Sequence, residues 1–367
     1  MTTRWRGLWR LLTYLIILII CPLLGVWLTD KPLSSYLTFL PAPVQPQSPP
    51  FSWAAFFLIA GFVMLCLRPF LSKIIFSKKQ PLPEQREKYP FPRWGWLGVA
   101  LMIISWILAW NRFAWFEPFQ EFTFTPLWLS YILVINALSY RRTGKCLLIN
   151  HTQHYLALFL VSAILWWSFE YLNRFIENWY YIGTADLGPE RYVIFATLPF
   201  STVLPAVLGT AEWVNTFPQI SADLNRFKPL NIPVSKGLAM ALISAGALGL
   251  TALGMWPGSL FFLMWLVPIL LIVGLQSLTE KPPLVSDIEA GDWRRIWTLA
   301  VAGLMCGIFW EMWNSHSLAY WKYSVPYVQR FEIFEMPFLG YAGYLPFGIV
   351  CGLFADFILA PFPKKTV

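Results

Sequence analysis

Two short motifs in this sequence bring a carboxylate and an amide onto one face of a helix. Glu170 and Asn173 are three residues apart, and so are Glu311 and Asn314. Residues at this spacing share a helix face. Each motif ends a long apolar run, where a carboxylate facing lipid would be costly. The spacing therefore predicts that both carboxylates point into a shared vestibule, with Glu170 and Glu311 as an acid/base or headgroup-orienting pair.

Similar flanking residues make the two motifs look like copies of one unit. Each is followed by a Trp-x-Tyr segment, and a weaker third copy contains Asn111 but has Leu108 in place of the glutamate. All three copies start on the same side of the predicted membrane, which predicts parallel internal repeats. Trp and Tyr also collect at every membrane interface, so an aromatic belt remains the alternative. The candidate ligand-binding residues are Asn111, Asn173, Asn314, Trp179, Trp321, Tyr323, Glu335, Tyr341 and Tyr344.

Two further features lie close to the second motif. His316 follows Glu311 closely and is a candidate base or proton relay, with a plain loop histidine as the favoured alternative. The segment from Pro337 to Pro346 has two prolines and two glycines at membrane depth. Proline frees carbonyls from the helical ladder, and these are tolerated only against protein or a wet cavity. The segment is predicted to be either a broken helix lining the vestibule or a kinked helix that starts at a proline.

The composition identifies the class of protein that must position these residues. The chain has 367 residues, of which 57% are apolar and 13% are charged, and its mean hydropathy is +0.56. A soluble protein carries about 25% charged residues. A soluble enzyme, a disordered chain and a nucleic-acid-binding domain are therefore excluded. We expect an all-α polytopic bundle forming a single transmembrane domain over residues 1–367.

Apolar runs of about 20 residues predict membrane-spanning helices. Ten such runs are present, and the predicted parallel repeats occupy spans 3–4, 5–6 and 9–10. The runs cover residues 9–28, 52–71, 95–111, 126–140, 154–172, 192–213, 237–255, 259–277, 295–313 and 337–360.

The charge distribution predicts how the bundle is oriented. Counted over this topology, 21 of the 27 Lys and Arg residues fall on the side that holds both termini. The positive-inside rule then places both termini in the cytoplasm of a bacterial cell, in its inner membrane. The net charge of +8 thus predicts anionic lipid rather than nucleic acid as the partner. Residues 29–51 would form a Pro-rich outer loop, and residues 72–94 a basic cytoplasmic loop.

Several chemistries lack their motifs in the sequence. The five cysteines form no C-x-x-C pair, the three histidines form no ligand set, and there is no Walker loop or G-x-S-x-G elbow. We therefore expect neither a metal site nor a cofactor.

The last 60 residues or so resemble a known family. Trp310-Glu311-Met312-Trp313-Asn314 and Phe334-Glu335-Met336-Pro337 are similar to motifs of an uncharacterised family of bacterial multispanning membrane proteins. The resemblance implies no activity, cofactor or partner. A looser likeness, of architecture alone, is to small membrane lycopene cyclases, whose Pro-x-Glu-type motif this sequence does not match.

Three functions fit these features. The first is a protein that binds or modifies a lipid or isoprenoid-like molecule in an outward-facing Trp/Glu/Asn vestibule. The second is an ion or solute transporter or channel, which needs a polar path from the vestibule to Glu212 or Asp356. The third is a non-catalytic scaffold subunit of a membrane complex, which predicts flat apolar faces without an enclosed cavity. Whether the chain is an enzyme stays open.

Overall fold

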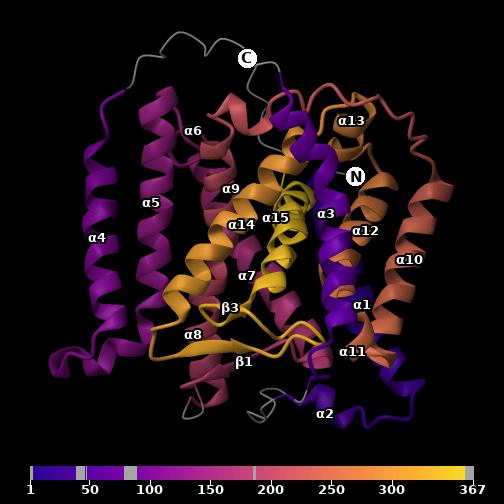
Figure 1. The fold of residues 1–367 in the computed structure, drawn as a ribbon, viewed down its shortest axis with the longest axis horizontal. Helices are drawn as coiled ribbons and strands as arrows, with labels where there is room; N and C mark the ends of the chain where they lie inside the picture. The colour runs from indigo at the N-terminus through magenta and orange to yellow at the C-terminus, as the bar shows by residue number, and fades with distance from the viewer. Residues whose placement is uncertain (1–2, 39–45, 47, 78–88, 185–186, 360–367) are drawn as a thin grey trace.

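The computed structural model describes residues 3–38, 46, 48–77, 89–184 and 187–359, with side chains from residue 7 onward. It is an all-helical bundle whose long helices run side by side (Figure 1). Two short strands, β1 (Trp179–Ile182) and β2 (Tyr320–Tyr323), cross one end, which we call the strand end. The helices α6 (Leu147–Asn150) and α13 (Pro283–Glu289) mark the opposite end.

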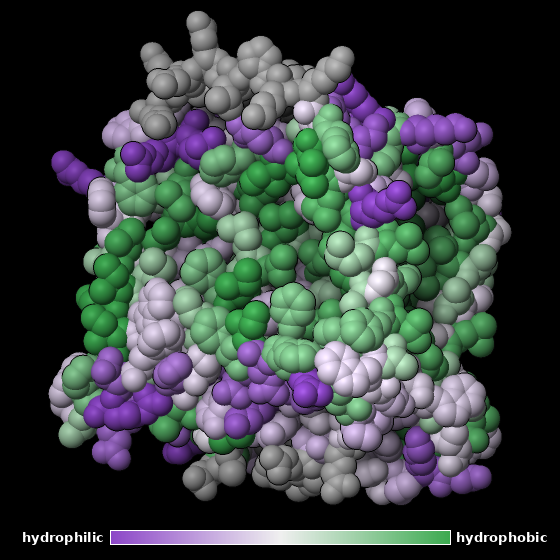
Figure 2. Space-filling view, viewed as in Figure 1, coloured by the Kyte–Doolittle hydropathy of each residue, from purple (hydrophilic) through white to green (hydrophobic). Residues whose placement is uncertain are grey.

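Within the described residues, eight helical segments are long and apolar enough to cross a membrane, so the chain is a multi-pass membrane protein. Figure 2 shows hydrophobic side chains across the middle of one face and hydrophilic ones gathered at both ends. The segments lie in α1 (Thr3–Trp27), α3 (Trp53–Ile75), α4 (Arg93–Trp110), α7 (Thr152–Ile176), α8 with α9 (Pro189–Ser201, Val203–Val214), α10 (Lys236–Met255), α14 (Arg294–Asn314), and η3 with α15 (Phe338–Gly343, Tyr344–Ile358).

Each of the ten predicted spans contains a helix, but two differ from a simple span. The 3-10 helix η1 (Ala114–Phe122) meets α5 (Phe124–Thr143) at a bend of 69°. In the predicted span 259–277, α12 (Leu263–Ser277) has 15 residues, fewer than the roughly 20 needed to cross the hydrocarbon layer. The count of ten therefore stays a prediction.

The remaining elements are short connections. Of the predicted Pro-rich loop 29–51, residues 39–45 and 47 lie outside the described residues, as do residues 78–88 of the predicted basic loop 72–94. The short elements are α2 (Ser34–Leu37), η2 (Pro218–Ser221), α11 (Pro257–Leu260), β3 (Glu332–Ile333) and β4 (Met336–Pro337).

The segment from Pro337 to Pro346 combines both predicted forms. It starts as the 3-10 helix η3 and continues as the α-helix α15 from Tyr344. Pro346 lies in the first turn of α15, where a missing N–H disrupts little. The segment therefore positions Tyr344 at a helix start, close to α14.

Glycines allow α14 and α15 to approach each other at backbone distance. A Cβ atom on Gly303 would lie 2.4 Å from the carbonyl oxygen of Tyr344, and one on Gly348 would lie 2.1 Å from that of Leu299. Both distances are far inside van der Waals contact, so only glycine fits. This contact fixes Tyr344 beside Glu311, because the two residues belong to the two packed helices.

We expect Gly348→Ala to force α14 and α15 apart and to lower the free energy of unfolding by about 1–3 kcal/mol. Thermal melting in detergent micelles should show a lower midpoint. Gly61→Ala on α3 is the control, because no atom lies within 4 Å of a Cβ built there. Equal melting of the Gly348→Ala variant and the control would contradict the close contact.

Candidate functional site

Glu170, near the end of α7, is held by donors from two elements. Its Oε1 accepts hydrogen bonds from Trp166 Nε1 at 3.0 Å, from Trp179 Nε1 at 3.1 Å and from Tyr181 Oη at 2.5 Å. Trp166 lies one turn earlier on α7. Trp179 and Tyr181 are two residues apart on β1, so their side chains share one face of the strand. The carboxylate therefore ties the strand to the helix, and it acts as an acceptor in all three bonds.

Glu311, near the end of α14, is held in a similar way and is fully buried, with 0% exposure. Its Oε1 accepts hydrogen bonds from Tyr323 Oη at 2.7 Å and from Tyr344 Oη at 2.5 Å. Trp321 Nε1 in turn donates to Tyr323 Oη at 2.8 Å. The second oxygen, Oε2, is buried and has no hydrogen-bond partner among the described residues.

The asparagine of each motif anchors the strand that follows. Asn314 Nδ2 donates to the carbonyl of Trp321 at 2.7 Å, and its Oδ1 accepts the N–H of the same residue at 2.8 Å. Asn173 bonds both backbone groups of Trp179 at 2.7 and 3.3 Å. Each side-chain amide thus bonds the N–H and the C=O of one strand residue, as the backbone of a neighbouring strand would. Both asparagines, predicted as ligand-binding residues, use their amides to hold the backbone of the two tryptophans.

The two strands pair with each other and bring the two motifs together. They are antiparallel, with Trp179 opposite Tyr323 and Tyr181 opposite Trp321. Side chains alternate between the faces of a strand, so these four aromatic residues share one face. The paired strands therefore form an aromatic cover that is bound to Glu170 on one side and to Glu311 on the other.

A cavity with an empty volume of about 1040 Å³, including its open part, lies against this cover. Its lining is mainly aromatic, and among its lining residues in the described chain Glu121 is the one charged side chain. The aromatic residues that line it are Phe124, Trp166, Trp179, Tyr181, Tyr192, Phe195, Phe200, Trp265, Trp310, Tyr320, Trp321, Tyr323 and Tyr344.

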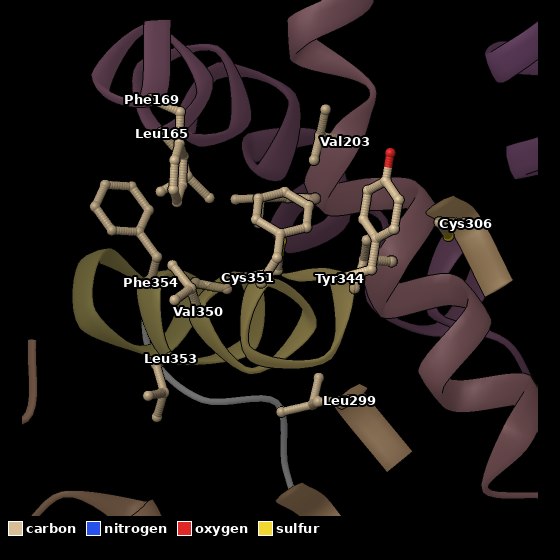
Figure 3. Packing of buried hydrophobic residues seen from close by; sticks show 14 of the residues in the cluster. Leu165, Phe169, Val203, Leu299, Cys306, Tyr344, Val350, Cys351, Leu353 and Phe354 are labelled. Carbon is tan, nitrogen blue, oxygen red and sulfur yellow. The ribbon is translucent and has the colours of Figure 1, made fainter. Parts of the chain in front are cut away.

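Phe347 packs behind three of the tryptophans that line the cavity. It is fully buried, and its ring centre lies 5.5 Å from that of Trp166 and 5.9 Å from those of Trp265 and Trp310. Figure 3 shows the packing further along α15, where Val350 and Phe354 meet side chains of other helices. Phe347 and these residues of α15 thus belong to the apolar core of the bundle.

The elements η1 and α8 border the cavity on another side. Glu121 of η1 and Phe195 of α8 both line it, and the rings of Phe122 and Phe195 are 5.7 Å apart. Along η1, Trp115 and Phe119 are exposed by 71% and 60%. An aromatic 3-10 segment at a sharp angle to its helix is typical of the membrane–water interface.

Comparison with known proteins adds no relative. The chain matches no family model, no curated protein and no solved structure. The site must therefore be interpreted from its own geometry.

The structure brings together several predicted residues of both motifs. Trp179, Trp321, Tyr323 and Tyr344 line the cavity, and Glu170 and Glu311 lie directly behind the rings that donate to them. The carboxylates therefore support the wall and do not form it.

Four other predicted residues lie outside the cavity. Asn111 is exposed and bonds the carbonyl of Ile107 at its own helix end, and His316 is exposed beside Ser315, with its ring against Trp110. Oε2 of Glu335 lies 3.9 Å from Nζ of Lys322, and the hydroxyl of Tyr341 donates to the carbonyl of Ile333. The segment after Asn111, predicted as part of a third motif copy, forms the 3-10 helix η1, whereas the segments after Asn173 and Asn314 form strands. These four residues contact local backbone or surface groups instead of the cavity.

Some lining residues carried no sequence signal. Trp265 on α12 and Tyr192 on α8 line the cavity, yet neither belongs to a motif. Their position follows from helix packing, as in the stacking of Trp265 on Phe169 with ring centres 5.3 Å apart. Trp166 could have been found, because it stands one helical turn before Glu170.

Burial keeps the phenols of the cover protonated. The pKa of Tyr181 is raised well above its ordinary value, mainly by burial and to a smaller extent by the nearby carboxylate of Glu170. Burial, and then Glu311, does the same to the pKa of Tyr323. A raised pKa means that the protonated form persists to higher pH. Both hydroxyls therefore remain hydrogen-bond donors at neutral and moderately alkaline pH.

Proposed function

We propose that this protein binds a lipid or isoprenoid-like molecule in the aromatic cavity, as a multi-pass protein of a bacterial inner membrane. The observation that carries the proposal is the cavity itself, with its aromatic lining and the buried ring of Phe347 behind Trp166, Trp265 and Trp310. A ligand with a long apolar part fits this chemistry.

The proposed orientation places the cavity toward the outer leaflet. With ten spans and both termini in the cytoplasm, the strand end faces outward, and anionic lipid is the proposed partner of the basic opposite end. The exposed aromatic residues of η1, including Trp115 and Phe119, would then lie at the outer interface. The ligand would enter from that interface, between η1 and α8.

The geometry favours binding over chemistry on the ligand. The oxygens Glu170 Oε1 and Glu311 Oε1 already accept hydrogen bonds from the aromatic wall. Acid/base catalysis by Glu170 or Glu311 would require these carboxyl groups to lie within reach of the ligand, and the rings stand in between. Modification of the ligand is therefore the secondary form of this proposal.

Transport is the second candidate, and the buried ring of Phe347 behind the tryptophans of the wall argues against it. The predicted inner acids are engaged near the opposite end, where Glu212 accepts the N–H of Leu147 at 2.8 Å and Asp356 pairs with Arg295. The buried hydroxyls of Tyr131 and Thr210 bond each other at 2.8 Å within the bundle. The third candidate, a non-catalytic scaffold subunit, would not need a cavity of this kind.

Photolabelling tests the proposal. The probe is hexadecanol with a diazirine in its chain, added to the full-length protein in lipid nanodiscs. We expect labelled peptides to include the cavity segments 192–203 and 336–344. Labelling restricted to outward-facing helix surfaces such as α3 would overturn the proposal.

A pair of glycine variants controls for access to the cavity. A Cβ on Gly343 meets Trp265 at an ordinary 3.5 Å, so Gly343→Phe fits the backbone and extends into the cavity. We expect it to reduce labelling of residues 192–203 about tenfold. Gly61→Phe, in open space on α3, should leave that labelling unchanged.

A further inference from the structure

The charges around the cavity indicate the chemical class of the ligand, an inference that rests on the proposed function. We propose that the ligand carries a cation, namely a quaternary ammonium group, which binds against the aromatic wall. The inference starts from the lining, where Glu121 is the one charged residue in the described chain. Two more carboxylates, Glu170 and Glu311, lie directly behind the wall.

An anionic group would be unfavourable in this cavity. A phosphate or carboxylate would lie near three carboxylates, without a Lys, Arg or His among the described lining residues. The lysine between Trp321 and Tyr323 on β2 is Lys322, and its Nζ lies 3.9 Å from Glu335. Lys322 therefore pairs with Glu335 and is not among the residues that line the cavity.

The hydrogen-bond donors beside the two glutamates are already used. Trp166 and Trp179 donate their indole N–H groups to Glu170, and Trp321 donates to the hydroxyl of Tyr323. The hydroxyls of Tyr181, Tyr323 and Tyr344 donate to the two glutamates. This part of the wall thus presents ring faces to the ligand and keeps its polar edges for the protein. A quaternary ammonium group, which needs no hydrogen-bond donor, fits such a surface.

The same bonds strengthen the attraction of the rings for a cation. The face of an aromatic ring is its negative side, and a cation placed over it is attracted. Donation of the N–H or O–H of a ring to a carboxylate polarises the ring further in the same sense. Cages of Trp and Tyr are a known means of recognising quaternary ammonium groups. Both the ring faces and the carboxylates behind them therefore favour a cation.

Three probes that differ in the head group alone test the inference. Each has the same alkyl tail with a diazirine beside its head, which is trimethylammonium, tert-butyl or carboxylate. The first two have the same shape and differ in charge. With the full-length protein in nanodiscs, we expect trimethylammonium to label the segments 192–203 and 336–344 about tenfold more than tert-butyl. The carboxylate should label them least.

Conservative variants report on the charge behind the wall. Glu170→Gln combined with Glu311→Gln keeps an oxygen acceptor at each site and removes the negative charges. We expect this variant to lose most of the preference for trimethylammonium, while tert-butyl labelling stays within about twofold of wild type. Retained tert-butyl labelling shows that the cavity is still formed.

The outcomes separate this inference from the proposed function. Equal cavity labelling by trimethylammonium and tert-butyl overturns the cation inference and leaves the lipid site standing. A preference that survives in the double glutamine variant also overturns it, because the carboxylates would then have no part. Failure of all the probes to label the cavity overturns both proposals.

Discussion

Replacing Glu311 by alanine is expected to destabilise the strand end of the bundle by about 3 kcal/mol or more. The substitution removes the acceptor of two buried phenols, Tyr323 and Tyr344. A buried donor left without a partner costs about 1–3 kcal/mol. Thermal or denaturant-induced unfolding of the variant in detergent measures the loss of stability. Glu311→Gln should lose much less, since it keeps an oxygen for both hydroxyls.

A compensating variant separates the hydrogen bonds from the loss of volume. Glu311→Leu combined with Tyr323→Phe and Tyr344→Phe removes the carboxylate and both of its donors. Replacing a group together with its partners by apolar groups of similar shape costs little, and the one bond lost besides these is that from Trp321 Nε1 to Tyr323 Oη. This triple variant should therefore melt closer to wild type than Glu311→Ala does. If Glu311→Ala itself melts like wild type, the carboxylate does not hold the two tyrosines.

The second large effect is expected at the strand-anchoring asparagines. Asn314→Ala deletes both hydrogen bonds to the backbone of Trp321 and should cost about 2 kcal/mol, at roughly 1 kcal/mol for each bond. Asn173→Ala should behave alike at Trp179, because its amide bonds the same two backbone groups there. Hydrogen exchange of peptides covering β1 and β2 should become faster in both variants.

Asn111→Ala is the matched control for this prediction. Its amide is exposed and bonds a carbonyl of its own helix, that of Ile107 at 2.8 Å. We expect a change within about 0.5 kcal/mol and unchanged exchange in both strands. If all three asparagine variants gave the same effect, the anchoring role would be refuted.

Much of the site could be predicted from residue spacing. The Glu-x-x-Asn spacing predicts that Glu170 and Glu311 point into a vestibule, whereas both lie behind the rings that line the cavity. The Trp-x-Tyr segments that follow contain Trp179, Trp321 and Tyr323, which line it. Periodicity sufficed here because each motif is local to one helix end and one strand. The helical, multi-pass class followed from composition and is confirmed by the eight candidate spans.

The remaining features depend on packing that spacing does not encode. Asn111 resembles the other two asparagines in sequence, but the chain after it folds into η1. There Gln120 donates to the carbonyls of Leu108 and Ala109 at the end of α4, at 2.8 and 3.3 Å. Trp265 reaches the cavity because of the rotation of α12 against its neighbours. Such rotation is set by contacts between helices far apart in the sequence.

The most direct test of the account is a cryo-EM map of the protein in nanodiscs made from native lipid. The central claim is that a ligand occupies the space between the two glutamate motifs. The account predicts elongated density enclosed by Trp166, Trp265 and Trp310, with its head toward the aromatic cover. A map in which side chains fill this space, and lipid density is found solely around the outside of the bundle, would contradict it.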